Sequence, residues 1–290
     1  MSKWDGKSRG TVLGYKIFLF FIRTFGIGSA YFILRIVSFY YFLFVGKRKQ
    51  HILDFYIQAL GISRIHAQAL LRKSFYVFGQ TLIDRIAFLM GRDKEYTLTM
   101  NGEEHLLQMQ TLGRGGMMLS AHLGNWETAG NMLKRRVSST INVIMLEAEE
   151  ANIKQYLDSS TGGGSHFKII AIKNDLSHII KINNALSNNE LIAMHADRTK
   201  EGSKSVEVEF FGRKAHFPLG PFIIASKFNA PISFVYAVKA GNRNYDLFAT
   251  PLITTKMKPE EIAVLYVKEL EKKVRLNPEQ WFNYYDFYAQ

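Results

Sequence analysis

The chain has 290 residues, of which 47% are hydrophobic, so it can bury one sizeable core, and a second full domain is not expected. It contains no cysteine, which excludes disulfides, thiolate metal sites and cysteine nucleophiles. Eight of the net 12 positive charges come from residues 6–53, which contain no Asp or Glu. This distribution favours an anionic membrane surface as the partner and argues against a nucleic-acid-binding face.

Residues 15–45 are apolar and rich in aromatic side chains, and glycines near the middle predict a break between two helices, Tyr15–Phe25 and Ser29–Val45. Arg23 and Arg35 interrupt this segment, so neither uncharged run reaches the roughly 18 residues of a clean transmembrane helix. Three interpretations stay open: an interfacial or re-entrant anchor, a tilted span with snorkelling arginines, and a buried core helix.

The apolar segment ends in a basic run, Lys47-Arg48-Lys49. By the positive-inside rule, that end of the segment is expected to face the cytoplasm. We therefore predict a hydrophobic membrane-associating segment over residues 1–49 and a separate folded domain over residues 50–290.

The remainder of the chain shows first a helical and then an alternating pattern. Apolar residues at three- and four-residue spacing predict helices over Ile62–Leu71 and Phe75–Met90. From residue 114 onward, short apolar runs predict the strands Met117–Ala121, Ile141–Leu146, Phe167–Ile172, Leu191–His195, Val206–Phe211, Ile232–Val238 and Tyr245–Leu252. Between several of them lie the predicted helices Glu127–Arg136, Asp175–Ser187, Leu219–Phe228 and Pro259–Arg275. The alternation predicts an α/β fold in which helices flank a mixed sheet, preceded by the N-terminal hydrophobic helical anchor.

The sharpest chemical feature is the run Ser120-Ala121-His122-Leu123-Gly124-Asn125-Trp126-Glu127. An apolar strand ends at Ala121 and a helix begins near Trp126, so His122 is expected at the carboxyl edge of the sheet, where α/β folds place their sites. Glu127 lies in the first helical turn and is expected to fold back toward His122. A carboxylate there would fix the imidazole tautomer and stabilise the imidazolium that forms during proton abstraction.

The same residues also have a plainer interpretation, in which His122 is a capping or core histidine and Glu127 only favours the helix dipole. A metal site is weakly supported, because the spacing is not His-Glu-x-x-His and the other candidate ligands, His195 and Asp197, come from another strand. Ser120 lacks a Gly-x-Ser-x-Gly elbow, which argues against a serine hydrolase.

Residues 121–127 resemble the His-x4-Asp/Glu block of the lysophospholipid acyltransferase superfamily. Within it, they are most similar to the block of the lipid A biosynthesis lauroyl/myristoyl (late) acyltransferases, which favour His-Phe-Gly-Asn-Trp-Glu. The likeness covers most of the chain and includes four further blocks in the same order: Phe75–Asp84, Met194–Gly212, Pro218–Ile232 and Pro278–Phe282. The order of five blocks is far more specific than any one of them.

This resemblance implies an acyltransferase at the cytoplasmic leaflet of a bacterial inner membrane, with residues 50–290 as its catalytic domain. The acyl donor would be a thioester of acyl carrier protein or coenzyme A, and the acceptor a lipid. The resemblance implies His122 as the general base for an acceptor hydroxyl or amine, with Glu127 as its orienting partner and no covalent acyl-enzyme. This chemistry requires no metal and no other cofactor.

The resemblance also suggests roles for neighbouring residues. Candidate hydrogen-bond donors to the oxyanion of the reacting carbonyl are Asn125, the backbone amides near Gly124, and Arg198. Asp197 matches an aspartate of the family and is expected to support the site, its plainer role being that of a strand-end turn residue. Gly124 and Trp126 are expected beside the substrate. Candidates for contact with phosphate groups or an acidic carrier protein, or simply for a solvated helix end, are Lys134, Arg135 and Arg136.

Two departures from the family pattern leave the acceptor open. Arg198 stands where the family usually has Gln, and residues 283–288 lack the more basic pattern usual at that end. The acceptor is therefore a lipid A precursor, another glycolipid, an aminolipid or a lysophospholipid. Two other functions also stay open: a non-catalytic, membrane-tethered lipid-binding protein on the same fold, and an acyl-thioester hydrolase.

Overall fold

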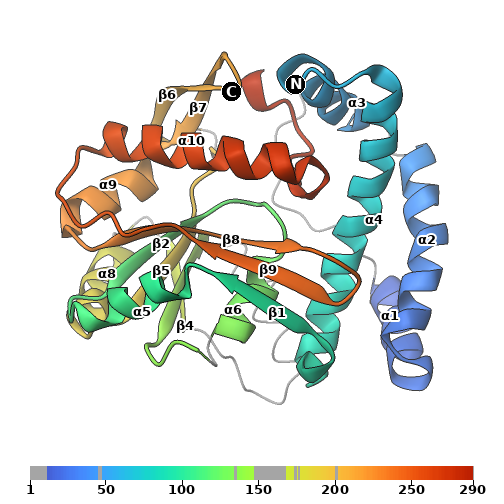
Figure 1. The fold of residues 1–290 in the computed structure, drawn as a ribbon, viewed down its shortest axis with the longest axis horizontal. Coiled ribbons are helices and arrows are strands. Elements are labelled where there is room, and N and C mark those ends of the chain that lie inside the picture. Colours follow the sequence, from blue (N-terminus) through green and yellow to red (C-terminus); the bar gives the residue numbers. More distant parts are fainter. Residues whose placement is uncertain are drawn as a thin grey trace.

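A computed structural model describes residues 12–44, 48–133, 136–146, 168–172, 175, 177–199 and 202–289 of the protein (Figure 1). Its helices are α1 (Val12–Phe25), α2 (Ile27–Phe44), α3 (Arg48–Asp54), α4 (Arg64–Leu89), α5 (Glu103–Thr111), α6 (Trp126–Leu133), α8 (Ser177–Ser187), α9 (Leu219–Phe228) and α10 (Pro259–Leu276). Its strands are β1 (Thr97–Asn101), β2 (Gly116–Ser120), β3 (Ile141–Leu146), β4 (Lys168–Ile172), β5 (Leu191–His195), β6 (Ser205–Phe210), β7 (Arg213–Pro218), β8 (Ile232–Lys239) and β9 (Asn244–Ala249). Short π-helical and 3₁₀ turns lie at Phe55–Ala59, Asp93–Glu95, Pro278–Gln280 and Phe287–Ala289.

The sheet at the centre of the fold has seven strands in the order β1-β9-β8-β2-β5-β3-β4. Strands β8 and β9 are antiparallel, and all other neighbouring pairs in this sheet are parallel. Strands β6 and β7 form a separate antiparallel ribbon. The prediction of an α/β fold with a mixed sheet flanked by helices is therefore confirmed.

The central strand β2 is buried on both faces of the sheet. Met117 and Leu119 enter a core formed with α8, α9 and α10, whereas Met118 enters a second core on the other face with α5 and α6. Figure 1 shows α10 and α6 on these opposite faces. Because both faces are covered, the middle strands read as continuous apolar runs, which is why the sequence predicts them well.

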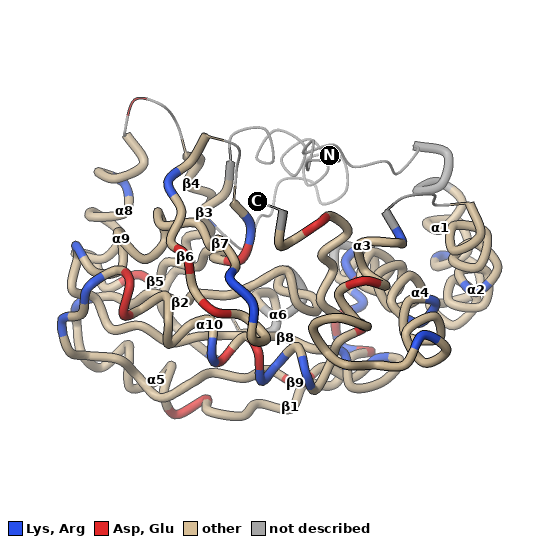
Figure 2. The backbone as a smooth tube through the Cα atoms, turned by 90° about the horizontal axis from the view of Figure 1, so that it is seen from above, with Lys and Arg blue, Asp and Glu red and all other residues tan. Residues whose placement is uncertain are grey.

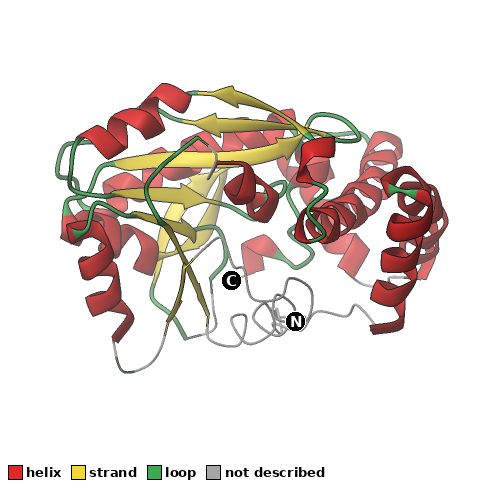
Figure 3. Cartoon of the chain, turned by 90° about the horizontal axis from the view of Figure 1, so that it is seen from below, coloured by secondary structure: helices red, strands yellow, loops and turns green. Residues whose placement is uncertain are grey.

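The N-terminal helices α1 and α2 form a hairpin that packs along α4 at one end of the sheet (Figure 3). The break predicted between them is at Gly26, whose φ is 83°. Helix α2 buries a stripe at helical spacing against α4, namely Ile27, Ala30, Tyr31, Leu34 and Ser38. The hairpin thus shares a core with the rest of the protein.

The opposite face of α2 is a run of large apolar side chains that are exposed: Phe32, Ile36, Phe39, Tyr40, Tyr41, Leu43 and Phe44. Helix α2 is apolar and long enough to cross a membrane, and only 28% of it is buried within the protein. Figure 2 shows no acidic position on either helix of the hairpin. Helix α2 therefore has one face packed on α4 and an opposite apolar face that is largely exposed.

Several elements differ from the sequence-based expectation. The two helices predicted over Ile62–Leu71 and Phe75–Met90 are a single helix, α4, which continues through the polar residues 72–74. Strand β1, helix α5 and strand β7 were not predicted. β1 lies at the edge of the sheet and β7 carries Arg, Lys and His, so neither presents an apolar run.

Candidate active site

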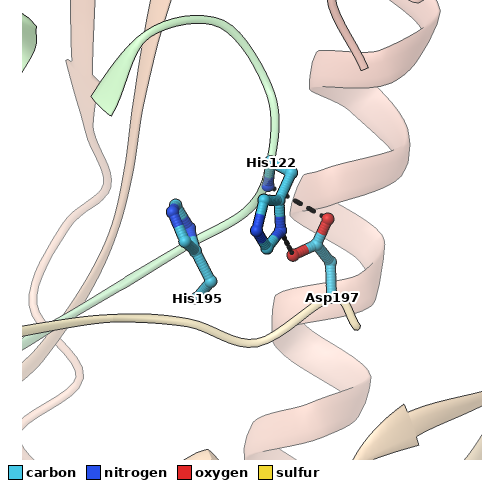
Figure 4. A group of neighbouring side chains, drawn as sticks. All are labelled: His122, His195 and Asp197. Atoms are coloured by element: carbon cyan, nitrogen blue, oxygen red, sulfur yellow. Dashed lines mark hydrogen bonds and ion pairs between the residues drawn. The ribbon is translucent and has the colours of Figure 1, made fainter. Parts of the chain in front are cut away.

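His122 and Asp197 come from the ends of two adjacent parallel strands. Strands β2 and β5 pair with Ser120 opposite His195, and each chain then continues past the carboxyl edge of the sheet. There the Nδ1 atom of His122 lies 2.7 Å from Oδ1 of Asp197, and the backbone N–H of His122 donates to Oδ2 at 3.0 Å (Figure 4). One carboxylate therefore fixes both the main chain and the ring of His122.

Asp197 is fully buried, and Trp281 also donates a hydrogen bond from Nε1 to Oδ2 at 3.3 Å. Burial alone would raise the pKa of Asp197, but the charge and hydrogen bond of His122, followed by the charge of Arg198, hold that pKa below its usual range. An ionised Asp197 accepts the Nδ1 proton of His122. The Nε2 atom is then left as the nitrogen that can take up a proton, on a side chain that is 24% exposed.

His195 lies on the other side of the His122 ring from Asp197 (Figure 4). The centres of the two imidazoles are 4.3 Å apart, and the Trp126 ring meets His195 edge-on at 5.4 Å. The Nδ1 atom of His195 is buried and has no hydrogen-bond partner among the described residues. Burial, followed by repulsion from His122, lowers the pKa of His195 to about 3, so this imidazole is neutral at physiological pH.

His122, His195 and Asp197 are also the candidate metal ligands in the described part of the chain, since one ligand atom of each lies within 4.8 Å of the others. Two imidazoles and a carboxylate are a donor set that zinc accepts. However, His122 and Asp197 share a proton across 2.7 Å, and a metal on those two atoms would have to displace it. The geometry is that of a hydrogen-bonded base held by its carboxylate.

The loop that carries His122 is held between β8 and the C-terminal segment. Gly124 and Asn125 donate their backbone N–H groups to the carbonyl oxygens of Gln280, at 2.9 Å, and Ala237, at 2.8 Å. Phe282 donates its own to the carbonyl of His122 at 3.0 Å. Gly124 has a φ of 73°, and a Cβ atom there would lie 1.8 Å from the Ala237 oxygen. Only glycine fits this position.

A buried polar network supports the same loop from the side of α4. The side-chain amide of Asn125 donates to the carbonyl of Thr81 at 3.2 Å and to the hydroxyl of Tyr245 at 3.3 Å. Tyr245 in turn donates to Asp84, a fully buried carboxylate that forms an ion pair with the buried Lys239. Asp84 also accepts hydrogen bonds from Tyr96, at 2.8 Å, and from Tyr31 of α2.

The other predicted site residues are placed as follows. Because the amides of Gly124 and Asn125 are engaged within the fold, they are not free donors in this structure. Arg198 donates from Nη2 to the carbonyl of Phe282 at 2.7 Å. Arg136 is exposed and lies 3.7 Å from Glu103 of α5. The side chain of Glu127 and the residues Lys134 and Arg135 lie outside what the structure describes, so their predicted roles stay predictions.

Two residues contribute more to the site in the structure than the sequence analysis predicted. Asp197, expected only to support the site, is the carboxylate bonded to His122. Trp281, which donates to Asp197, was not among the candidates. The sequence signal for Trp281 was the Pro-Glu-Gln-Trp run, which resembles a family block but by itself indicates no chemistry.

The class defined by this fold and site is an α/β protein with a histidine hydrogen-bonded to a buried carboxylate where two parallel strands end, an arrangement that suits general-base chemistry. The chain belongs to the bacterial lipid A biosynthesis acyltransferase family, whose model matches residues 7–284. It is also similar to the phosphatidylinositol mannoside acyltransferase of two strains of Mycobacterium tuberculosis, with 26% identity over 136 residues in each case. That match spans 46% of this chain and 42% of the length of each relative.

Proposed function

We propose that this protein is a membrane-associated acyltransferase that moves a fatty acyl group from an acyl thioester to a hydroxyl or amine of a lipid or glycolipid. Membership of the lipid A biosynthesis acyltransferase family supports the reaction class. The observation that carries the proposal is the bond of 2.7 Å between His122 and the buried Asp197, next to a partly exposed imidazole edge.

In the proposed reaction, Nε2 of His122 takes the proton of the acceptor while the acceptor atom bonds to the thioester carbonyl carbon. The carbon–sulfur bond then breaks, and the thiolate receives the proton back from His122. Asp197 keeps its negative charge throughout and stabilises the imidazolium formed in between. No covalent acyl-enzyme forms, so the absence of cysteine from the chain is no obstacle.

The donor in this proposal is acyl carrier protein or coenzyme A in thioester form. The name of the two relatives supports a glycolipid as the acceptor, since phosphatidylinositol mannosides carry sugar hydroxyls on a phospholipid. Lys134, Arg135 and Arg136 stay candidates for contact with the acidic donor or with phosphate groups.

The hairpin of α1 and α2 is the proposed membrane contact, at the cytoplasmic leaflet of a bacterial inner membrane. One face of α2 packs on α4, so the exposed aromatic face is suited to insertion into the surface of a bilayer. Two cations lie near the C-terminal end of α2. Arg72 lies 5.0 Å from the ring centre of Phe39, and Lys49 lies 5.9 Å from the ring centre of Phe42. Cations beside the exposed ring of Phe39 and the partly buried ring of Phe42 suit the level of anionic headgroups.

The direct test incubates the purified protein with a radiolabelled acyl thioester and vesicles of bacterial membrane lipids. We expect labelled lipid, and we expect His122→Ala to lower the rate by about 10²-fold or more, because a general base contributes that much. Release of free fatty acid alone would instead support a thioesterase, and no turnover would support a non-catalytic lipid-binding protein. Wild-type rates in the His122→Ala variant would refute the assigned base.

A further inference from the structure

We propose that His195 binds the acceptor oxygen together with His122, so that the reacting hydroxyl is held between two imidazoles. This inference rests on the proposed function and deepens it, because it assigns an acceptor-binding group and selects one class of acceptor atom. The contacts of His195 and the chemistry of its ring carry the argument.

The spacing of the two rings suits a shared oxygen atom. Their centres are 4.3 Å apart, and a ring nitrogen of each lies within 4.8 Å of the other. An oxygen with hydrogen bonds of about 2.8 Å to two nitrogens bridges a separation of up to about 5.6 Å. One hydroxyl group can therefore span the separation between a nitrogen of each ring.

Apart from a contact with the backbone of Ser120, His195 has unused hydrogen-bonding capacity among the described residues. It is the last residue of strand β5, yet its buried Nδ1 has no hydrogen-bond partner among the described residues, whereas buried polar atoms normally have one. Nδ1 is enclosed while the side chain as a whole is partly exposed, so Nε2 is the nitrogen left for a substrate. The Nε2 atom of this imidazole is therefore available to form a hydrogen bond with a ligand.

His195 is suited to donate a hydrogen bond and to leave the proton transfer to His122. Its burial keeps it neutral at physiological pH, and a neutral imidazole carries one N–H and one bare nitrogen. With the N–H on Nε2, His195 donates to the acceptor oxygen and orients the O–H bond toward Nε2 of His122. His195 itself exchanges no proton in the reaction.

This arrangement selects a hydroxyl over an amine. A hydroxyl oxygen has two lone pairs, so it accepts from His195 with one and attacks the carbonyl with the other. A neutral amine nitrogen has a single lone pair, which is the nucleophile itself. A hydrogen bond donated into that pair by His195 would hinder the attack, so transfer to oxygen is favoured at this site.

The test uses lauroyl-coenzyme A with two matched acceptors: octyl glucoside, and the same glucoside with an amine in place of its 6-hydroxyl. Rates are corrected by those of His122→Ala. His195→Met removes the donor at similar volume and should lower kcat/KM for the hydroxyl acceptor about 10-fold, as loss of a hydrogen bond to the reacting atom does. The ratio of hydroxyl to amine transfer should fall by a similar factor. His195→Gln, which keeps an N–H donor, should restore most of that ratio.

An equal loss with both acceptors, or no rescue by His195→Gln, would mean that His195 only supports the fold and would overturn the inference while the proposed function stands. If the wild-type protein acylates membrane lipids but neither glucoside, this inference fails while the proposed function stands; if it acylates none of them, both fail. Thermal unfolding of each variant checks that it is folded. If His195→Met is unfolded, His195→Leu and His195→Asn provide the same comparison of a missing and a retained donor.

Discussion

The carboxylate of Asp197 accepts three hydrogen bonds, two from His122 and one from Trp281, and it does so without contact with solvent. A buried carboxylate with this many donors stays ionised and keeps the Nδ1 proton on the imidazole. The side chain sets the tautomer of His122, and it is therefore the partner whose loss should affect proton transfer most.

We predict that Asp197→Asn lowers the acyl-transfer rate by about 10²-fold, because an amide in that place favours the wrong imidazole tautomer. Glu127→Gln should have a smaller effect, since Nδ1 of His122 already has a carboxylate partner. The measurement is the single-turnover rate of each variant with a labelled thioester. If Glu127→Gln lowers the rate more than Asp197→Asn does, Glu127 and not Asp197 is the carboxylate that orients His122. Thermal unfolding of both variants separates loss of chemistry from loss of fold.

At the scale of residues, the sequence was sufficient to place His122 at the sheet edge and insufficient to predict its hydrogen bond with Asp197. His122 follows an apolar run and precedes a Gly-Asn turn, and both signals are local. Asp197 lies 75 residues further along the chain, and its contact with His122 depends on the pairing of β2 with β5. No local pattern specifies which two strands become neighbours.

At the scale of elements, the loop after β2 is positioned by backbone contacts on both sides. Two backbone amides of the loop donate hydrogen bonds to the carbonyls of Gln280 and Ala237. The carbonyl of His122 accepts one from the amide of Phe282, so the C-terminal segment lies alongside the loop. Main-chain hydrogen bonds of the loop hold His122 in place, and these depend on the close approach of Gly124 to β8.

We predict that Gly124→Ala lowers the free energy of unfolding by about 2 kcal/mol or more and abolishes transfer, because its Cβ would overlap a backbone oxygen. The matched control is Gly113→Ala, since Gly113 has a φ of 67° but no atom within 4 Å of the added carbon. This control should lose about 1 kcal/mol, the cost of the dihedral angle alone. Urea unfolding of both variants makes the comparison, and equal losses would contradict the importance of the contact.

Elements with a clear apolar run or period were predicted almost residue for residue, whereas β1, α5 and β7 were missed. Strands β3 and β5 and helix α9 have the predicted bounds, because their apolar runs are bounded by turn signals. Strand β7 belongs to the two-stranded ribbon. Lys214 and His216 alternate along it with the buried residues Ala215 and Phe217, so its sequence has no continuous apolar run. Its pairing with β6 comes from the tertiary fold.

At the scale of the whole molecule, the apolar face of α2 lies on the side of the helix away from α4 and the sheet. The family, the basic N-terminal segment and this face together support attachment to a bilayer. Ile36 on this face is 65% exposed, and Ile180 on α8 is 66% exposed, which offers a matched pair of positions.

We predict that Ile36→Asp lowers the partition coefficient onto vesicles of phosphatidylglycerol and phosphatidylethanolamine about 10-fold, through loss of buried apolar area and added repulsion. Ile180→Asp, with the same change at a similarly exposed site, should bind like the wild type. Flotation of each protein with the vesicles measures the bound fraction. Equal losses in the two variants would show that the α2 face does not mediate attachment.

The hydroxyl of Tyr31 has a consequence for how this protein is organised. Tyr31 belongs to the hairpin of α1 and α2, yet its hydroxyl donates to Asp84. Tyr245 connects Asp84 to Asn125, which lies in the same loop as His122. A protease that removed the hairpin would leave a buried anion short of a donor and uncover the inner surface of α4. The hairpin therefore cannot be removed without disturbing the rest of the protein, because the sheet and α4 rely on it for part of their own interior.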